Sequence, residues 1–186
     1  MEFLLFFFIF VFGLIIGSFL NCVIYRLETS ETLKGRSHCV NCGHILSWRD
    51  LAPVFSFIFL RGRCRYCKKS ISLQYPAVEL ATGLIFLLIF NFIPLKAGLN
   101  EFLIFNLKNI FSFVYLLIIA SLLIIIFVYD LKHFLIPTNI LFSAVIITVA
   151  YRLALWSFEN WKLIENLKFK IEIFGTLFNP LLSAIG

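Results

Sequence analysis

Charged residues are scarce in this chain. They make up 14% of its 186 residues, whereas soluble proteins contain about a quarter. Hydrophobic residues make up 61%, phenylalanine alone occurs 24 times, and the mean hydropathy is +0.99. This composition excludes an ordinary soluble domain and predicts an integral membrane protein. No aromatic or helical docking module accompanies the basic residues, so we expect no nucleic-acid partner.

The N-terminus has no basic residue before Arg26. A cleaved signal peptide needs a basic start and a short apolar stretch, and here the apolar run continues well past that length. The run therefore predicts a retained membrane span at about 3–25. Three further runs, at about 76–94, 110–129 and 134–156, are each near the ~20 residues that a bilayer crossing requires. The sequence predicts an all-α polytopic membrane protein with about four transmembrane helices.

The basic residues are concentrated in one hydrophilic segment. Of 16 Lys and Arg, nine lie within 26–69, together with only three acidic residues. By the positive-inside rule, this loop is cytoplasmic and the N-terminus is outside, and its charge also suits anionic membrane lipids. We expect a first helix (1–25), a cytoplasmic domain (26–75) and a membrane bundle (76–186). The last eleven residues are apolar but too short to cross, so the C-terminal end of the bundle is expected to be incomplete.

Cysteine is infrequent, yet four of the five cysteines form two Cys-x-x-Cys pairs in the loop. Two such turns can surround one Zn²⁺ ion tetrahedrally, and a loop this small needs a metal to stabilise it. Gly43 and Gly62 suit the sharp turns. The alternatives are two disulfides, which rarely persist in the cytoplasm, or an iron–sulfur cluster. The predicted ligands of a structural zinc ion are Cys39, Cys42, Cys64 and Cys67.

Three more residues near the loop have simpler interpretations. His38 and His44 flank the first cysteine pair and are either substitute ligands or solvated side chains. Cys22 lies in the first span without a partner, as expected for a small apolar filler. None of the three changes the prediction of a four-cysteine site.

Two acidic residues lie at the cytoplasmic ends of predicted spans. Asp130 ends the third span and Glu79 begins the second, and a carboxylate there is costly unless it is hydrated, paired or functional. Asp130 can also simply mark a helix end, and Glu79 can extend to the surface. Peptide hydrolysis by carboxylates requires two of them. No other acid near this face stands in a motif that pairs with Asp130.

Three stretches together resemble the bacterial prepilin peptidases, the membrane aspartyl proteases that process type IV pilins and type II secretion pseudopilins. These are "GLIIGSFLNCVIYRL" (13–27), the cysteine loop through "YPAVELATG" (36–83), and "YDLKHFLIP" (129–137). The resemblance implies an enzyme of the bacterial inner membrane. It would cleave the prepilin leader at the cytoplasmic face and methylate the new N-terminus with S-adenosylmethionine.

The resemblance also implies residue roles. Asp130 corresponds to the first aspartate of the protease dyad, Glu79 to a glutamate associated with methyl transfer, and the four loop cysteines to the zinc ligands. Thr138 stands where the family usually has an acid or amide. The second aspartate of the family lies in a Gly-x-Gly-Asp motif, whose first glycine would fall at about Gly186. We therefore expect the 186 residues alone to be an inactive fragment.

Three other functions remain open on the sequence. The first is a membrane-anchored zinc module that scaffolds a pilus or secretion assembly without catalysis. The second is a methyltransferase without proteolysis, which would bind S-adenosylmethionine on its own. The third is an electron-transfer protein with iron on its cysteines, which would be coloured when purified.

Overall fold

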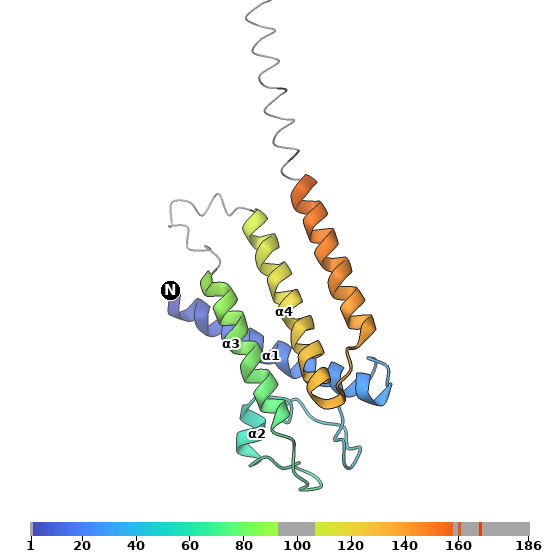
Figure 1. Cartoon of the computed structure of the whole chain (residues 1–186). Coiled ribbons are helices and arrows are strands. Elements are labelled where there is room, and N and C mark those ends of the chain that lie inside the picture. Colours follow the sequence, from blue (N-terminus) through green and yellow to red (C-terminus); the bar gives the residue numbers. More distant parts are fainter. Residues whose placement is uncertain (1, 93–106, 158–159, 161–167, 169–186) are drawn as a thin grey trace, which may run out of the picture. The chain divides into compact units, whose positions relative to one another are not determined.

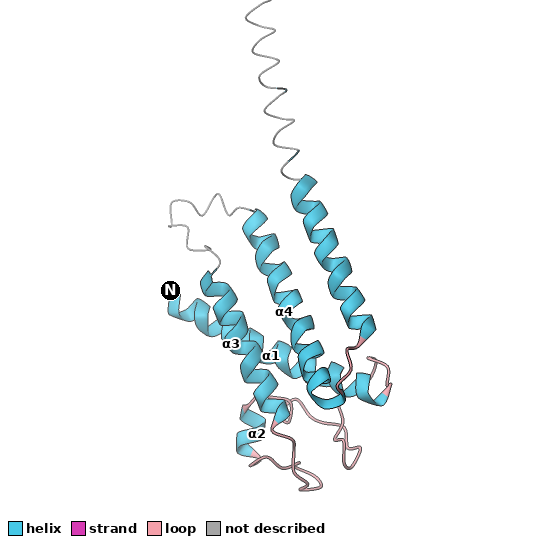
Figure 2. Ribbon diagram, viewed as in Figure 1, coloured by secondary structure: helices cyan, strands magenta, loops and turns pink. Residues whose placement is uncertain are grey.

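The computed structural model describes residues 2–92, 107–157, 160 and 168. Its labelled helices are α1 (Glu2–Thr29), the short α2 (Phe55–Phe59), α3 (Gln74–Phe92) and α4 (Leu107–His133), and a further helix covers Thr138–Ser157 (Figures 1 and 2). Within the described ranges there is no extended strand. Four of these helices are long and apolar enough to cross a membrane. The prediction of an all-α, multi-pass membrane protein is confirmed.

The chain divides into two compact units, 1–142 and 143–186. The first contains α1 to α4 and the cysteine loop. The division into 1–25, 26–75 and 76–186 stays a prediction. So does the expectation about the C-terminal end, because that end lies outside the described residues.

The loop-side ends of α1 and α4 lie farther along the chain than the sequence predicts. α1 continues to Thr29, where Ser30 turns left-handed (φ 56°) and the Glu31 N–H donates to the Arg26 carbonyl oxygen at 2.9 Å. This is a Schellman-type end. α4 continues through residues 130–133, beyond the predicted span, and ends where Phe134 turns left-handed (φ 52°). Asp130 thus lies in the last turn of α4.

The antiparallel pair of α1 and α3 is the basis of the first unit. Its register is constant, since each step forward along α1 is matched by an equal step back along α3. Facing pairs are Phe6 with Phe90, Gly13 with Gly83, Gly17 with Glu79, and Asn21 with Tyr75. A Cβ atom on Gly13 or on Gly17 would lie 2.7 Å from a Cα atom of α3. The two backbones are therefore in contact, as in small-residue crossings of membrane helices.

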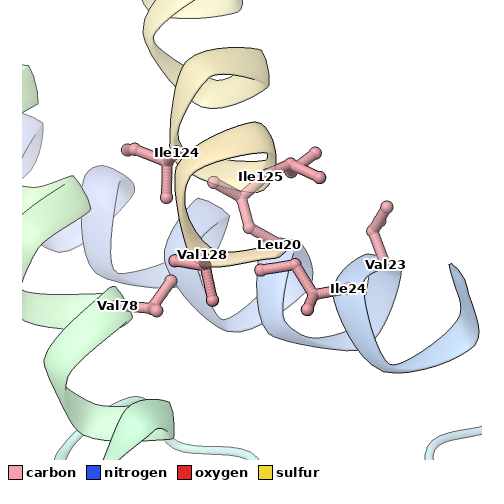
Figure 3. Close-up of a cluster of buried hydrophobic side chains, with 7 residues drawn as sticks. All are labelled: Leu20, Val23, Ile24, Val78, Ile124, Ile125 and Val128. Carbon is pink, nitrogen blue, oxygen red and sulfur yellow. The ribbon is translucent and has the colours of Figure 1, made fainter. Parts of the chain in front are cut away.

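α4 packs on this pair near the loop end. A buried apolar cluster joins the three helices (Figure 3), and its members are Leu20, Val23, Ile24, Val78, Ile124, Ile125 and Val128. Beyond the cluster, Lys132 of α4 forms an ion pair with Glu28 of α1 at 2.8 Å. Packing and charge together hold the last turn of α4 beside the end of α1.

The close crossing predicts the effect of Gly17→Ala. Replacing glycine with alanine within a helix normally stabilises by about 0.5–1 kcal/mol. Here the new methyl group would meet the α3 backbone, so we expect the free energy of unfolding to fall by about 1–3 kcal/mol. Thermal unfolding in detergent, followed by circular dichroism, measures the change. Phe19→Leu on the exposed side of α1 is the control, and an unchanged or raised Tm for Gly17→Ala would contradict the crossing.

Candidate functional site

The two cysteine pairs lie on two turns of the same construction. In the first, the Cys39 N–H donates to the His44 carbonyl oxygen at 2.9 Å and the Gly43 N–H to the Cys39 carbonyl oxygen at 2.8 Å. In the second, the Cys64 N–H donates to Lys69 at 2.8 Å and the Lys68 N–H to Cys64 at 3.1 Å. The left-handed residue is Gly43 (φ 68°) in one turn and Lys68 (φ 59°) in the other. Gly62, which precedes the second pair, is also left-handed (φ 67°), as its place beside a sharp turn predicts.

The turns bring all four cysteine sulfurs together. The sulfurs of Cys39, Cys42, Cys64 and Cys67 lie within 4.8 Å of one another. Cys39 and Cys67, from opposite turns, are 3.9 Å apart. A tetrahedral zinc site with Zn–S bonds of about 2.3 Å has sulfurs about 3.8 Å apart. The cluster therefore fits the predicted zinc ion. Four cysteine ligands would fill the coordination sphere of that ion, so no coordination position would remain for a substrate.

The thiols of Cys39 and Cys42 have different pKa values. Burial raises the pKa of Cys39, but hydrogen bonds from the Asn41 and Cys42 backbone and from neighbouring thiols outweigh it and lower the pKa to about 7. At Cys42 a backbone hydrogen bond from His44 lowers the pKa. Burial, the thiols of Cys39 and Cys67 and the charge on Cys39 outweigh it and raise the pKa to about 11. The negative charge on Cys39 thus disfavours ionisation of Cys42. A bound metal cation would offset the repulsion between the two thiolates.

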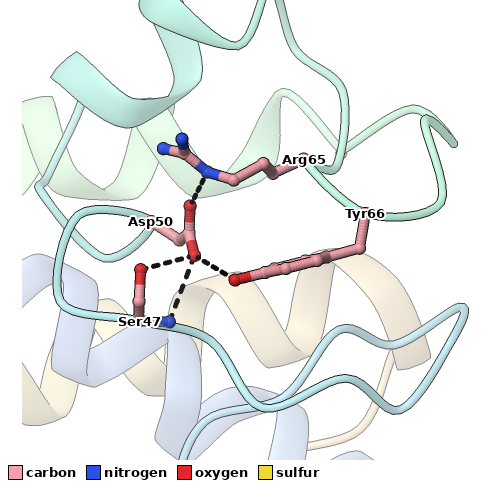
Figure 4. Close-up of polar contacts among 4 residues, drawn as sticks. All are labelled: Ser47, Asp50, Arg65 and Tyr66. Atoms are coloured by element: carbon pink, nitrogen blue, oxygen red, sulfur yellow. Dashed lines mark hydrogen bonds and ion pairs between the residues drawn. The ribbon is translucent and has the colours of Figure 1, made fainter.

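Asp50 connects the two halves of the loop (Figure 4). Its side chain is 3% exposed, and it accepts hydrogen bonds from the Ser47 N–H (3.1 Å), the Ser47 hydroxyl (2.8 Å) and Arg65 (2.6 Å). Burial raises the Asp50 pKa, but the Arg65 and Ser47 contacts outweigh it and hold the pKa below its usual value. Asp50 is a structural residue of the loop, and no motif in the sequence indicates this role.

Glu79 attaches the loop to the helix pair. It is buried (7% exposed) beside Gly17, and its Oε2 accepts the N–H of Val54 at 2.7 Å. Val54 precedes α2 and is left-handed (φ 61°), an unfavourable conformation for a β-branched residue. A carboxylate hydrogen bond helps to hold that conformation. Glu79 therefore does not extend to the surface, which was the alternative open on the sequence.

A cavity of about 460 Å³ lies between the end of α1, the start of α3 and the cysteine loop. Its lining includes Asn21, Tyr25, Tyr75 and Glu79. The Asn21 amide donates to the Tyr75 carbonyl oxygen at 2.9 Å, and its Oδ1 is buried without a hydrogen-bond partner among the described residues. An unsatisfied buried acceptor is costly, so hydrogen bonding of the Asn21 side chain at the cavity wall is incomplete.

Asp130 lies on a different face from the cavity. Lys132, two residues later, lines the cavity, but Asp130 does not. The Asp130 side chain is exposed beside Phe127 and Leu131, and among the described residues its carboxylate has no hydrogen bond or ion pair. The structure therefore does not bring Asp130 and Glu79 into one site, although both lie towards the loop end of their helices.

The remaining residues that the sequence singled out have structural partners. His44 stacks on Tyr66 with ring centroids 3.6 Å apart, and His38 packs edge-on against Tyr25 at 5.8 Å. Neither belongs to the sulfur cluster. Cys22 lines the cavity.

Sequence reasoning missed Arg26, which is buried and donates to the carbonyl oxygens of Thr32 and Gly35.

Comparison with known proteins gives consistent matches. Residues 11–93 match the bacterial peptidase A24 N-terminal domain. A prepilin leader peptidase/N-methyltransferase of Myxococcus xanthus is 36% identical over 156 residues, which are 82% of this chain and 42% of the relative. One of Pectobacterium carotovorum is 34% identical over 72% of this chain and 50% of the relative. One of Klebsiella pneumoniae is 44% identical over 44% of this chain and 39% of the relative.

The chain thus spans half or less of the length of these relatives. No solved structure matches it.

The sulfur cluster predicts the metal content of the purified protein. We expect about one zinc ion per chain and no visible colour. Cys64→Ser should lose most of the zinc, because three thiolates bind it less tightly than four. Cys22→Ser, a cysteine outside the cluster, should retain it. Metal analysis by inductively coupled plasma mass spectrometry measures both; bound iron, or equal zinc in the two variants, would contradict the assignment.

Proposed function

The chain belongs to the family of the bacterial prepilin peptidases, and from this relationship we propose the function of the complete protein. It is a membrane aspartyl peptidase that cleaves the leader of type IV prepilins or pseudopilins and then methylates the new N-terminus. The observation that supports this best is that the Glu79 cavity and Asp130 both lie at the loop end of the helices, although on different faces. The cavity beside Glu79 is lined by residues of α1, α3, α4 and the cysteine loop, and Asp130 lies in the last turn of α4.

The proposed orientation follows from charge. The loop, which carries the whole surplus of positive charge, faces the cytoplasm, and the N-terminus lies on the other side of the inner membrane. A prepilin with its apolar segment in the bilayer would then present its cleavage site at the level of Asp130. The loop with its zinc ion would lie on the same side.

Asp130 is proposed as one carboxylate of a catalytic dyad. In such a dyad one carboxylate removes a proton from the attacking water and the other protonates the substrate carbonyl. The exposed face of α4 around Asp130 is apolar, which suits contact with a further helix that carries the second acid. No Gly-x-Gly-Asp motif occurs within the 186 residues, so we expect no peptidase activity from this chain by itself.

The cavity is proposed as the site of the methyl donor. Its volume lies within the range of about 300–1,000 Å³ that is usual for small-molecule sites. Asn21 adds a polar side chain to the cavity wall, and Tyr25 and Tyr75 provide aromatic surface. S-adenosylmethionine, when bound, supplies an electrophilic methyl group. The Glu79 carboxylate would stabilise its positive charge.

The peptidase assignment is tested with Asp130→Asn in the complete protein. Loss of a general acid–base group lowers a rate by about 10²–10⁴-fold, and we expect leader cleavage of a prepilin to fall at least that far. Zinc content and methylation of a pre-cleaved pilin should not change. Glu31→Gln, an exposed acid of the loop, is the control. Cleavage at the normal rate by Asp130→Asn would refute the assignment.

The methyltransferase assignment is tested with Glu79→Gln. The side-chain oxygen of the introduced glutamine would still accept the Val54 N–H, so the loop should stay attached while the charge is lost. We expect the rate of methylation of a pre-cleaved pilin to fall by about 10- to 100-fold, which corresponds to the loss of one hydrogen bond or contact with a charged group. Leader cleavage should be retained. Equal loss of both activities would instead indicate that Glu79 acts only by holding the loop in place.

A further inference from the structure

The short helix α2 exposes its apolar side chains. Phe55 is 58% exposed, Ile58 62% and Phe59 81%, and no residue of α2 is buried. An isolated exposed apolar residue needs no explanation, but three on one five-residue helix form a contiguous patch. The patch requires a partner of low polarity.

The position of α2 beside the loop end of α3 indicates that this partner is the lipid bilayer. Val54, which directly precedes α2, is hydrogen-bonded to Glu79, the sixth residue of α3. At 1.5 Å per residue this point lies about 8 Å along the helix from its start. Figure 1 shows α2 beside the loop end of α3. Because α3 is a candidate membrane span, α2 lies at the depth of the headgroup region, where interfacial helices insert their apolar side chains by about 5–10 Å.

Three exposed cations lie together near the end of α2. A cavity of about 310 Å³ is lined by Arg61, Arg63 and Lys68, with Leu60 and Cys64. All three cations are exposed, and none has an ion pair within the described part of the chain. Arg65 differs, because Asp50 neutralises it. The lining contains no acid, so the cavity suits an anion such as a lipid phosphate.

We propose that α2 and this basic cavity form an interfacial anchor for the cysteine loop. Phe55, Ile58 and Phe59 insert into the leaflet on the loop side, and Arg61, Arg63 and Lys68 bind the phosphate of an anionic phospholipid. The anchor would hold the loop against the membrane from a second point, in addition to the bond between Glu79 and Val54. It requires only that α3 spans the bilayer, so it stands or falls independently of the enzymatic proposal.

Lipid photocrosslinking tests the apolar part of the anchor. The chain is reconstituted into vesicles of phosphatidylcholine and phosphatidylglycerol with p-benzoylphenylalanine at position 59, and lipid adducts are measured by mass spectrometry. Position 33 is the control, because Leu33 is also 61% exposed but follows α1. Along the axis of α1, the end of the helix lies about 18 Å past Gly17, which faces Glu79. Leu33 follows that end, so we expect it to lie farther from the membrane than α2. We expect adducts at 59 and few at 33; equal labelling, or none at 59, would overturn the proposal.

Lipid binding tests the basic part. Each cation near an anionic surface contributes about a fivefold gain in affinity, so the combined change of Arg61, Arg63 and Lys68 to Gln should weaken phosphatidylglycerol binding on the order of 100-fold. The matched control changes three exposed cations elsewhere in the loop to Gln, namely Lys34, Arg36 and Arg49. Native mass spectrometry in detergent measures bound lipid, and circular dichroism verifies folding.

Two results of the binding experiment would overturn the basic site. One is an equal loss in the control variant, which would show a general charge effect. The other is binding of inorganic phosphate at the same site with no binding of phosphatidylglycerol, which would make the ligand a free anion. Retained phosphatidylglycerol binding in the control, together with its loss in the Arg61, Arg63 and Lys68 variant, supports the anchor.

Discussion

The contact between the backbones of α1 and α3 is the constraint on which the first unit of the protein depends. Gly13 and Gly17 leave no side chain between the helices, so association in lipid can rely on close packing where no water is present to drive it. The constant register places Glu79 against Gly17 and Tyr75 against Asn21. It also fixes how far the end of α1 extends past the start of α3. The part of α1 that extends past α3 lines one side of the cavity, and residues of the cysteine loop line another.

The loop is held by polar contacts, since it has little apolar core of its own. Four sulfurs join its two turns, Asp50 joins the first half to Arg65, and Arg26 holds its first residues. Glu79 then ties Val54 to the membrane pair. A buried carboxylate is costly to desolvate, and here it satisfies a backbone N–H in an otherwise unfavourable turn. This arrangement explains why an acid lies inside a membrane span even before any catalytic role is considered.

The two proposed reactions use different faces of one scaffold. The Glu79 cavity lies within the group of helices and loop, whereas Asp130 lies on the exposed side of α4. The ion pair of Lys132 with Glu28 connects α4 to the rim of the cavity. Separate sites agree with a two-step process in which cleavage produces the N-terminus that is then methylated.

Much of this architecture is readable from the sequence. Long apolar runs determine the spans, and the two Cys-x-x-Cys pairs predict the sulfur cluster because their spacing leaves few alternatives. The helices α1 and α4 extend about four residues beyond the predicted spans, and Ser30 and Phe134 end them in the left-handed conformation that glycine usually adopts. The spacing of Gly13 and Gly17 was an available signal for the helix crossing.

The roles of Asp50 and Val54 had no such signal. Each depends on partners that the fold brings from elsewhere in the chain, Arg65 for one and Glu79 for the other. Lys68 had no such signal either, because it takes in the second turn the left-handed place that Gly43 takes in the first.

The attachment of the loop to the membrane helices is the central claim, and hydrogen exchange of the Val54 amide tests it most directly. The measurement uses the complete protein in lipid nanodiscs and resolves single amides by fragmentation. A hydrogen bond to a buried carboxylate predicts exchange far slower than at the exposed loop residues 32–36. Exchange at Val54 as fast as at those residues would show that Glu79 does not hold the loop, and would contradict the account.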